Sequence, residues 1–137
     1  MEYLPFGPRD TLAKVPFGFS VAQKVAGLGT FRYRLGCALF ENNKTLVSVG
    51  INQVKTHPTQ LRYSNRGQFR PYLHAEIHAL CMARKEVHKG TAYIARLSAK
   101  GMAADSRPCS GCQLALTSNG FRYMVYHLDG NLWKEGL

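Results

Sequence analysis

The feature that most constrains this chain is a pair of short motifs, His74-Ala75-Glu76 and Pro108-Cys109-Ser110-Gly111-Cys112. Zinc in proteins prefers four tetrahedral ligands drawn from thiolates and imidazoles, and a catalytic zinc leaves one of those positions to water. One histidine and two cysteines supply three ligands and leave the fourth position open. The fold must therefore bring two distant segments together around a single metal ion.

The spacing within each motif suits the start of a helix. Cys109 and Cys112 are three residues apart, so in a first helical turn both thiols point the same way. His74 and Glu76 diverge, so the imidazole can face a metal while the carboxylate reaches a water beside it. Free N–H groups and the positive end of the helix dipole favour thiolates there. A bound zinc ion brings the pKa of its water to about 7. We therefore expect one catalytic Zn²⁺ per chain, with Glu76 as the group that moves protons.

Two other interpretations of the cysteines stay open. A C-x-x-C pair can be a redox couple, and a structural zinc would take a fourth side-chain ligand. Cys37, Cys81, His57 and His78 are available for that role by count. Cys37 lies in an apolar strand pattern and Cys81 on a helix face, so we expect both to be small core residues.

Composition narrows the class of protein. The chain has 137 residues, enough for one domain, which we place at 17–137 behind a proline-containing arm at 1–16. It has no apolar run of roughly 18 residues and no secretory signal pattern, so no membrane span is expected. Its four cysteines, two of them in a metal pattern, favour a reducing cytoplasm. The net charge of +10 favours a phosphate-bearing partner, either a nucleotide or a nucleic acid, over a merely solubilising surface.

Hydrophobic periodicity and turn residues predict alternating elements after an initial hairpin. Val21, Val25 and Leu28 mark one face of the first helix, and Leu114 and Leu116 are expected to be buried by the last. The order predicts an α/β fold in which helices sandwich one mixed sheet of four or five strands. The expected helices are 17–28, 74–88 and 109–119, and the expected strands are 32–40 and 45–52, paired as a hairpin, 91–97 and 121–127.

A long connection, 53–73, separates the hairpin from the first motif and contains no acidic residue. Loops of this length in small domains are usually functional or disordered. Cations interleaved with aromatic rings suit phosphates and bases, although a basic surface loop with aromatics in the core fits equally well. The residues concerned are Lys55, Arg62, Tyr63, Arg66, Phe69, Arg70 and Tyr72.

From about residue 17 to 127 the motifs and element order resemble the cytidine and deoxycytidylate deaminase superfamily. The resemblance implies a three-layer α-β-α fold, a zinc ion held by the histidine and both motif cysteines, and Glu76 as proton shuttle. Gly50-Ile51-Asn52 is similar to the family's Gly-x-Asn, whose asparagine contacts the substrate. We expect substrate contacts from Asn52, Lys55, Arg70, Ala75 and Pro108.

Different parts of the sequence resemble different branches of the superfamily. The stretch from His74 to Leu80 is similar to tRNA adenosine deaminases, but Arg107 stands where that branch usually has glutamate. The short tail and the Lys55-Thr56-His57-Pro58 stretch resemble compact phage-encoded deaminase-like proteins, which would act in the host cytoplasm. Superfamily members are commonly oligomers, so the resemblance implies a homo-oligomer.

The expected activity is hydrolytic deamination of a cytosine nucleotide, such as dCMP or CMP, to its uracil form with release of ammonia. One alternative is a deaminase acting on cytosine or adenine in single-stranded DNA or RNA. Another is a non-catalytic module of the same fold that binds zinc and nucleic acid. The intact Glu76 argues against this last alternative, because a scaffold has no use for that carboxylate.

Overall fold

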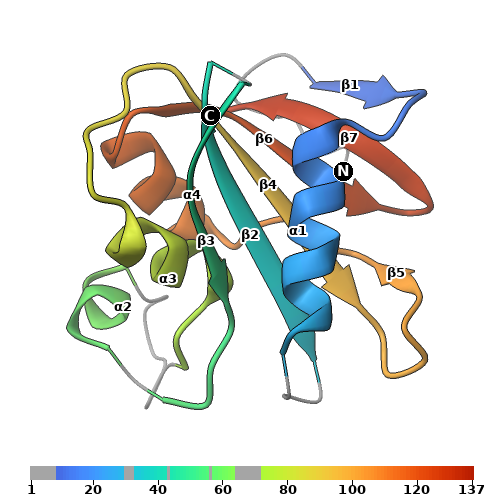
Figure 1. Ribbon diagram of the computed structural model, residues 1–137, viewed down its shortest axis with the longest axis horizontal. Coiled ribbons are helices and arrows are strands. Elements are labelled where there is room, and N and C mark those ends of the chain that lie inside the picture. The colour runs from blue at the N-terminus through green and yellow to red at the C-terminus, as the bar shows by residue number, and fades with distance from the viewer. Residues whose placement is uncertain (1–8, 30–32, 43, 56, 64–71) are drawn as a thin grey trace.

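The computed structural model describes residues 9–29, 33–42, 44–55, 57–63 and 72–137 (Figure 1). No helix within them is both long and apolar enough to cross a membrane. In chain order the elements are β1 (Arg9–Leu12), α1 (Phe17–Gly27), β2 (Arg34–Glu41), β3 (Thr45–Ile51), α2 (Pro58–Arg62), α3 (Ala75–Met82), β4 (Gly90–Leu97), β5 (Ala103–Ala104), α4 (Ser110–Ser118), β6 (Phe121–Leu128) and β7 (Asn131–Gly136).

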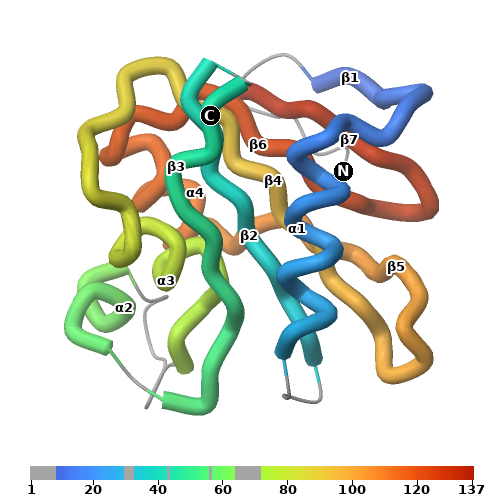
Figure 2. Tube along the Cα trace, in the orientation of Figure 1, coloured from blue at the N-terminus to red at the C-terminus, as the bar shows by residue number. Residues whose placement is uncertain are grey.

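The strands form one mixed sheet in the order β1-β7-β6-β4-β2-β3, with β5 attached to the end of β4. Strands β4 and β6 run parallel, and the other described neighbours are antiparallel. The predicted α/β fold with a mixed sheet is therefore confirmed, as is the hairpin of β2 and β3. The trace in Figure 2 shows β1 and β7 side by side, at the opposite edge of the sheet from β3.

The described sheet has seven strands, more than the four or five expected. Asp129 and Gly130 both have positive φ, 52° and 81°, as a two-residue hairpin turn requires, and this turn folds β7 back along β6. Within the predicted arm, β1 then pairs with β7 in a register that sets Arg9 opposite Glu135. These short strands were missed because each is defined by its pairing partner and not by an apolar alternation of its own.

Alternating side chains on the central strands divide the core into two layers. Cys37 and Leu39 of β2 belong to the cluster under α3 and α4, whereas Ala38 and Phe40 belong to the cluster under α1. Residues of β4 and β6 alternate in the same way, as expected for strands buried on both faces. The three-layer α-β-α arrangement is therefore confirmed, with α1 on one face and both motif helices on the other (Figure 1).

The buried face of α1 consists of Phe19 and Val25 together with three small residues, Gly18, Ala22 and Ala26. Of the residues that mark the predicted apolar face, Val25 is buried and Leu28 is 77% exposed, whereas Ala22 and Ala26 are fully buried. The reason is a close approach of the helix to β2. A Cβ placed on Gly36 would lie only 2.3 Å from the carbonyl oxygen of Ala22, so the helix backbone rests directly on the glycine.

Helix α3 is shorter than predicted. It ends at Met82, where Ala83 turns to an extended conformation, and it does not continue to His88. The chain then runs as a loop that returns one apolar side chain, Val87, to the core before β4 begins. The apolar spacing beyond Met82 was therefore a poor guide to the helix end, because Val87 reaches the core from a loop.

Of the two cysteines and two leucines expected in the core, one of each is buried and one of each is exposed. Cys37 is fully buried and Leu116 is fully buried, as expected. Cys81 is exposed and Leu114 is 59% exposed, so both predictions of a core position were wrong. Ala75 and Ala79 line the inner side of α3, and they bring this helix so close to β3 that larger side chains lie elsewhere on its surface.

The contact between α3 and β3 yields a first test. A Cβ added to Gly50 would lie 2.4 Å from both the Ala75 oxygen and the Ala79 nitrogen, which are backbone atoms of α3. We expect Gly50→Ala to lower the free energy of unfolding by about 3 kcal/mol, because the helix must shift to admit the methyl group. Urea denaturation measures this change.

The matched control is Gly27→Ala at the end of α1, where the added Cβ would lie 4.0 Å from a methyl carbon of Leu97, an ordinary van der Waals distance. This variant should be as stable as the parent or gain roughly 0.5 kcal/mol from helix propensity. Equal stability of the two variants would contradict the close packing of α3 on β3.

Candidate active site

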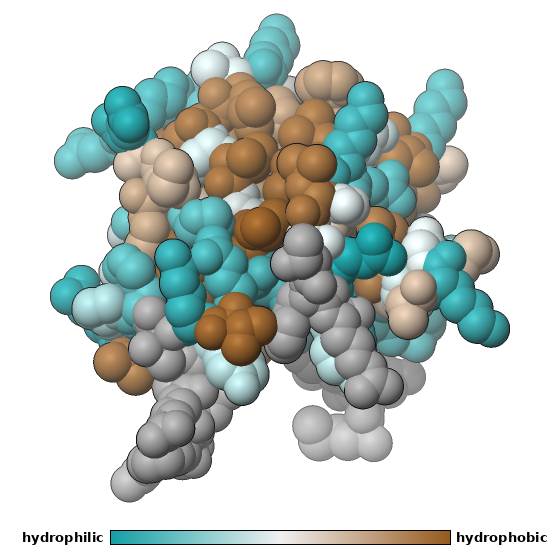
Figure 3. Space-filling view, turned by 60° about the horizontal axis from the view of Figure 1, so that its bottom comes forward, coloured by the Kyte–Doolittle hydropathy of each residue, from teal (hydrophilic) through white to brown (hydrophobic). Residues whose placement is uncertain are grey.

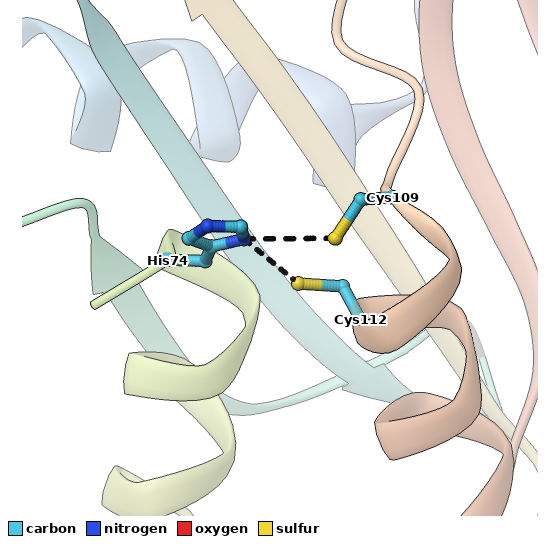
Figure 4. A group of neighbouring side chains, drawn as sticks. All are labelled: His74, Cys109 and Cys112. Carbon is cyan, nitrogen blue, oxygen red and sulfur yellow. Dashed lines mark hydrogen bonds between the residues drawn. The ribbon is translucent and has the colours of Figure 1, made fainter. Parts of the chain in front are cut away.

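The two sequence motifs meet at the N-terminal ends of α3 and α4 (Figure 4). His74 and Cys109 are the N-cap residues of these helices, and both have the extended conformation usual at that position. Cys112 lies one turn into α4 and is fully buried. The backbone N–H of His74 donates to the side-chain oxygen of Gln60, at 2.9 Å, so α2 fixes the start of α3.

The distances between the three side chains fit one tetrahedral metal ion. His74 Nδ1 lies 3.3 Å from the sulfur of Cys112 and 3.7 Å from the sulfur of Cys109. All three ligand atoms lie within 4.8 Å of one another. Tetrahedral zinc with ordinary Zn–N and Zn–S bonds separates its nitrogen and sulfur ligands by about 3.6 Å. The donor set and its spacing therefore fit zinc.

The surroundings of Cys109 favour its thiolate form even before a metal binds. The hydrogen bond from the Cys112 thiol, helped by His74, lowers the pKa of Cys109 to about 4. The same hydrogen bond, together with burial, raises the pKa of Cys112. The hydrogen bond with Cys109 raises the pKa of His74. Without metal, the two cysteines thus hold one proton between them, and metal binding would displace it.

Glu76 lies beside the ligand group without joining it. The residue is 3% exposed, in the first turn of α3, and burial raises the pKa of its carboxyl. Among the described residues, no fourth His, Cys, Asp or Glu extends the group of three ligands. Of the alternative ligands considered above, His78 accepts a hydrogen bond from the Ile51 N–H at 3.0 Å, and Cys81 lies 3.9 Å from His57. The described site therefore offers three metal ligands and, beside them, one buried carboxylate.

A cavity of about 310 Å³ opens onto this centre, a size typical of small-molecule sites. Of the predicted substrate contacts, Asn52 and Ala75 line it. Lys55 is exposed and Pro108 is buried, and neither is among its lining residues, while Arg70 lies outside the described residues. The full lining is Tyr33, Leu35, Asn52, Tyr72, Leu73, His74, Ala75, Glu76, Arg107 and Cys109.

Asn52 has structural contacts in addition to its place in the cavity wall. Its side-chain oxygen accepts a hydrogen bond from the Leu35 N–H at 2.9 Å, and its amide nitrogen donates to the Tyr33 carbonyl at 2.5 Å. The asparagine at the end of β3 therefore holds the start of β2 in place. A substrate would meet an amide whose orientation these two bonds already determine.

Arg107 connects the loop before Cys109 to the last strand. Its guanidinium donates to both carboxylate oxygens of Glu135, at 3.2 and 2.9 Å, and Glu135 also accepts from the Tyr126 hydroxyl at 2.5 Å. Glu135 is fully buried and the Arg107 side chain is 22% exposed, so the carboxylate of the pair is shielded from water. Sequence reasoning noted Arg107 only as a departure from a related motif. Nothing in the local sequence around Glu135 indicates the partnership, because 28 residues separate the two.

The face that carries the start of β2 and the approach to α3 is turned forward in Figure 3. Hydrophobic side chains gather at its centre, and hydrophilic side chains project around them. Tyr33 and Tyr72, which line the cavity, are 48% and 52% exposed. Aromatic side chains at the edge of the cavity suit a planar, partly polar ligand.

A search of curated proteins found no match to this chain. Among solved structures, one similar chain is the apo dCMP deaminase from the cyanophage S-TIM5, with 16% identity over 82% of each chain and a TM-score of 0.49. Another is a mutant cytidine deaminase from Mycobacterium tuberculosis, with 18% identity over 80% of this chain and 82% of that chain, and a TM-score of 0.48.

The profile of a family described as "Cytidine and deoxycytidylate deaminase zinc-binding region" matches residues 19–128. The match covers most of the chain, from α1 to the end of β6, and includes both motifs and the cavity. Together with a His, Cys, Cys group able to hold one Zn²⁺, it establishes that the chain belongs to the cytidine and deoxycytidylate deaminase family and is a zinc-dependent hydrolase of that type.

Proposed function

We propose that this protein hydrolyses the exocyclic amino group of cytosine in a nucleotide such as dCMP or CMP, giving the uracil nucleotide and ammonia. In this proposal His74, Cys109 and Cys112 hold the zinc ion, and Glu76 is the catalytic acid–base. The observation that carries it is the buried Glu76 carboxylate, which faces the same cavity as the ligand group without belonging to that group.

Zinc, when bound, supplies an acidified water at neutral pH. Glu76 accepts a proton from the attacking water and delivers a proton to N3 of the cytosine ring. A new C4–O bond forms. Glu76 then takes the second water proton from the C4 hydroxyl and passes it to the amine as the C4–N bond breaks, which leaves the C4 carbonyl of uracil. The balance is cytosine plus water to uracil plus ammonia. Burial favours this role, because it raises the pKa of the Glu76 carboxyl above its ordinary value and so makes the carboxylate a stronger base.

The positive net charge of the protein favours a nucleotide over a free nucleoside as the substrate. The net charge of +10 attracts phosphate-bearing ligands. Asn52 and Ala75 line the cavity and are proposed to contact the sugar or the base. Lys55 and Arg70, in the basic connection, remain predicted phosphate contacts, and Pro108 remains a predicted contact near the reacting carbon.

One structural observation favours a second candidate substrate, cytosine in single-stranded nucleic acid. The two cavity-lining tyrosines, Tyr33 and Tyr72, are about half exposed, so they place aromatic surface at the edge of the cavity, where the bases beside a target nucleotide would lie. Aromatic stacking is the usual way in which single strands are held without reading their sequence.

Ammonia release from a panel of compounds tests both candidates. The panel comprises dCMP, CMP, the two corresponding nucleosides and a short cytosine-containing single-stranded oligonucleotide. We expect kcat/KM for a mononucleotide to exceed that for its nucleoside by about tenfold or more. Faster turnover of the oligonucleotide, with a steep salt dependence, would transfer the assignment to the second candidate. No ammonia from any of these compounds would refute the proposed function. Sedimentation of the same preparation tests the predicted homo-oligomer.

A further inference from the structure

A charged side chain stands next to the cavity without lining it. Arg96 lies near the end of β4, directly opposite Leu35 of β2 in the antiparallel register. Its side chain is on the same face of β4 as Ile94, two residues earlier, and that face packs toward α3 and α4. Leu35 and its neighbour Tyr33 are cavity residues, so Arg96 borders the wall of the proposed active site.

The contacts of Arg96 leave part of its guanidinium unsatisfied. Its central carbon lies 5.1 Å from the centre of the Tyr33 ring, within the range of a cation–π contact. Its Nε is buried and has no hydrogen-bond partner within the described residues. By contrast, Arg34 donates to the Ser98 carbonyl at 3.2 Å, and Arg107 is paired with Glu135.

The charge of Arg96 is also uncompensated by a carboxylate. In the described part of the chain the side-chain ion pairs are Lys85 with Glu41 and Arg107 with Glu135, and neither includes Arg96. A buried donor without an acceptor costs free energy, which an anionic ligand would recover. Guanidinium groups bind phosphate oxygens with directed, charge-assisted hydrogen bonds.

We propose that Arg96 is a specificity-determining residue that binds the phosphate of the nucleotide whose base enters the cavity. The inference rests on the proposed function and adds to it the residue that distinguishes a nucleotide from a nucleoside. Tyr33, stacked on Arg96 and facing the cavity, connects the phosphate contact to the base site.

The test compares Arg96→Gln with Arg122→Gln, a control at the start of the parallel strand β6. Arg122 is exposed and lies at the opposite end of the sheet, beside the first residues of β4. For Arg96→Gln we expect KM for dCMP to rise about 10- to 100-fold with little change in kcat, while the kinetics of deoxycytidine stay as in the parent. Arg96→Lys should recover part of the loss, because it restores the charge without the fork of donors. The control should match the parent on both substrates.

A second readout does not depend on turnover. In the parent and the control, dCMP should raise the Tm more than deoxycytidine at equal concentration, and in Arg96→Gln this difference should disappear. Equal losses on dCMP and deoxycytidine, or an unchanged KM for dCMP, would overturn the inference and leave the proposed function standing. A loss confined to the oligonucleotide would assign Arg96 to a strand phosphate and overturn the mononucleotide assignment. If no cytosine compound is deaminated, the proposed function fails, and the Tm difference still decides the role of Arg96.

Discussion

Glu76→Gln should abolish deamination while leaving zinc bound. The amide has nearly the same shape as the carboxyl but neither accepts nor returns a proton, so we expect kcat to fall by at least about 10³-fold. Zinc content should remain at one ion per chain, because Glu76 lies outside the group of ligand atoms. Ammonia release and elemental analysis of the same preparation measure the two quantities.

The control for this experiment is Glu86→Gln. Glu86 is exposed in the loop after α3, so its loss removes the same charge from the protein without touching the cavity. It should keep the parent rate. A Glu76→Gln protein with near-parent turnover would exclude Glu76 as the acid–base, and one without zinc would show that the carboxylate belongs to the coordination sphere.

Cys112→Ala should have the largest effect on stability. Cys112 is fully buried in the first turn of α4, and its sulfur is one of three proposed zinc ligands. Because metal affinity is part of the folding free energy, we expect zinc content to fall to near zero and the Tm to fall by more than about 10 °C. Treating the parent with a strong chelator should produce a similar drop, reversed by added zinc.

Cys81→Ala is the matched control. Cys81 is an exposed cysteine on the neighbouring helix α3, so its replacement should leave zinc content and Tm unchanged. Full zinc occupancy in Cys112→Ala would mean that the metal is held by other groups. A chelated parent as stable as the zinc-bound one would show that the ion contributes nothing to folding.

The sequence was sufficient to predict the centre of this protein because its chemistry depends on short spacings. The first-turn geometry of a helix relates Cys109 to Cys112 whatever surrounds them, and His74 to Glu76 likewise. The strand at 91–97 was predicted for a similar reason, because its residues 92–95 form a continuous apolar run, as burial on both faces of a sheet requires.

The errors came from interactions between distant segments. The parts of α1 and α3 that touch Gly36 and Gly50 are alanines, and a search for large aliphatic side chains overlooks them. The cavity-lining Tyr33 and Leu35 come from the start of β2 and follow no motif. The contacts of Asn52 with the β2 backbone likewise depend on tertiary structure and leave no local pattern in the sequence.

The bond between Arg107 and Glu135 has a consequence for dynamics. The segment that presents Cys109 is fastened to a strand formed 28 residues later, so opening of β7 and loosening of the metal loop should occur in one cooperative event. Metal occupancy should then slow amide hydrogen exchange in β7, although none of its residues belongs to the ligand group. Hydrogen exchange in the hairpin of β6 and β7 would thereby depend on whether the metal is bound.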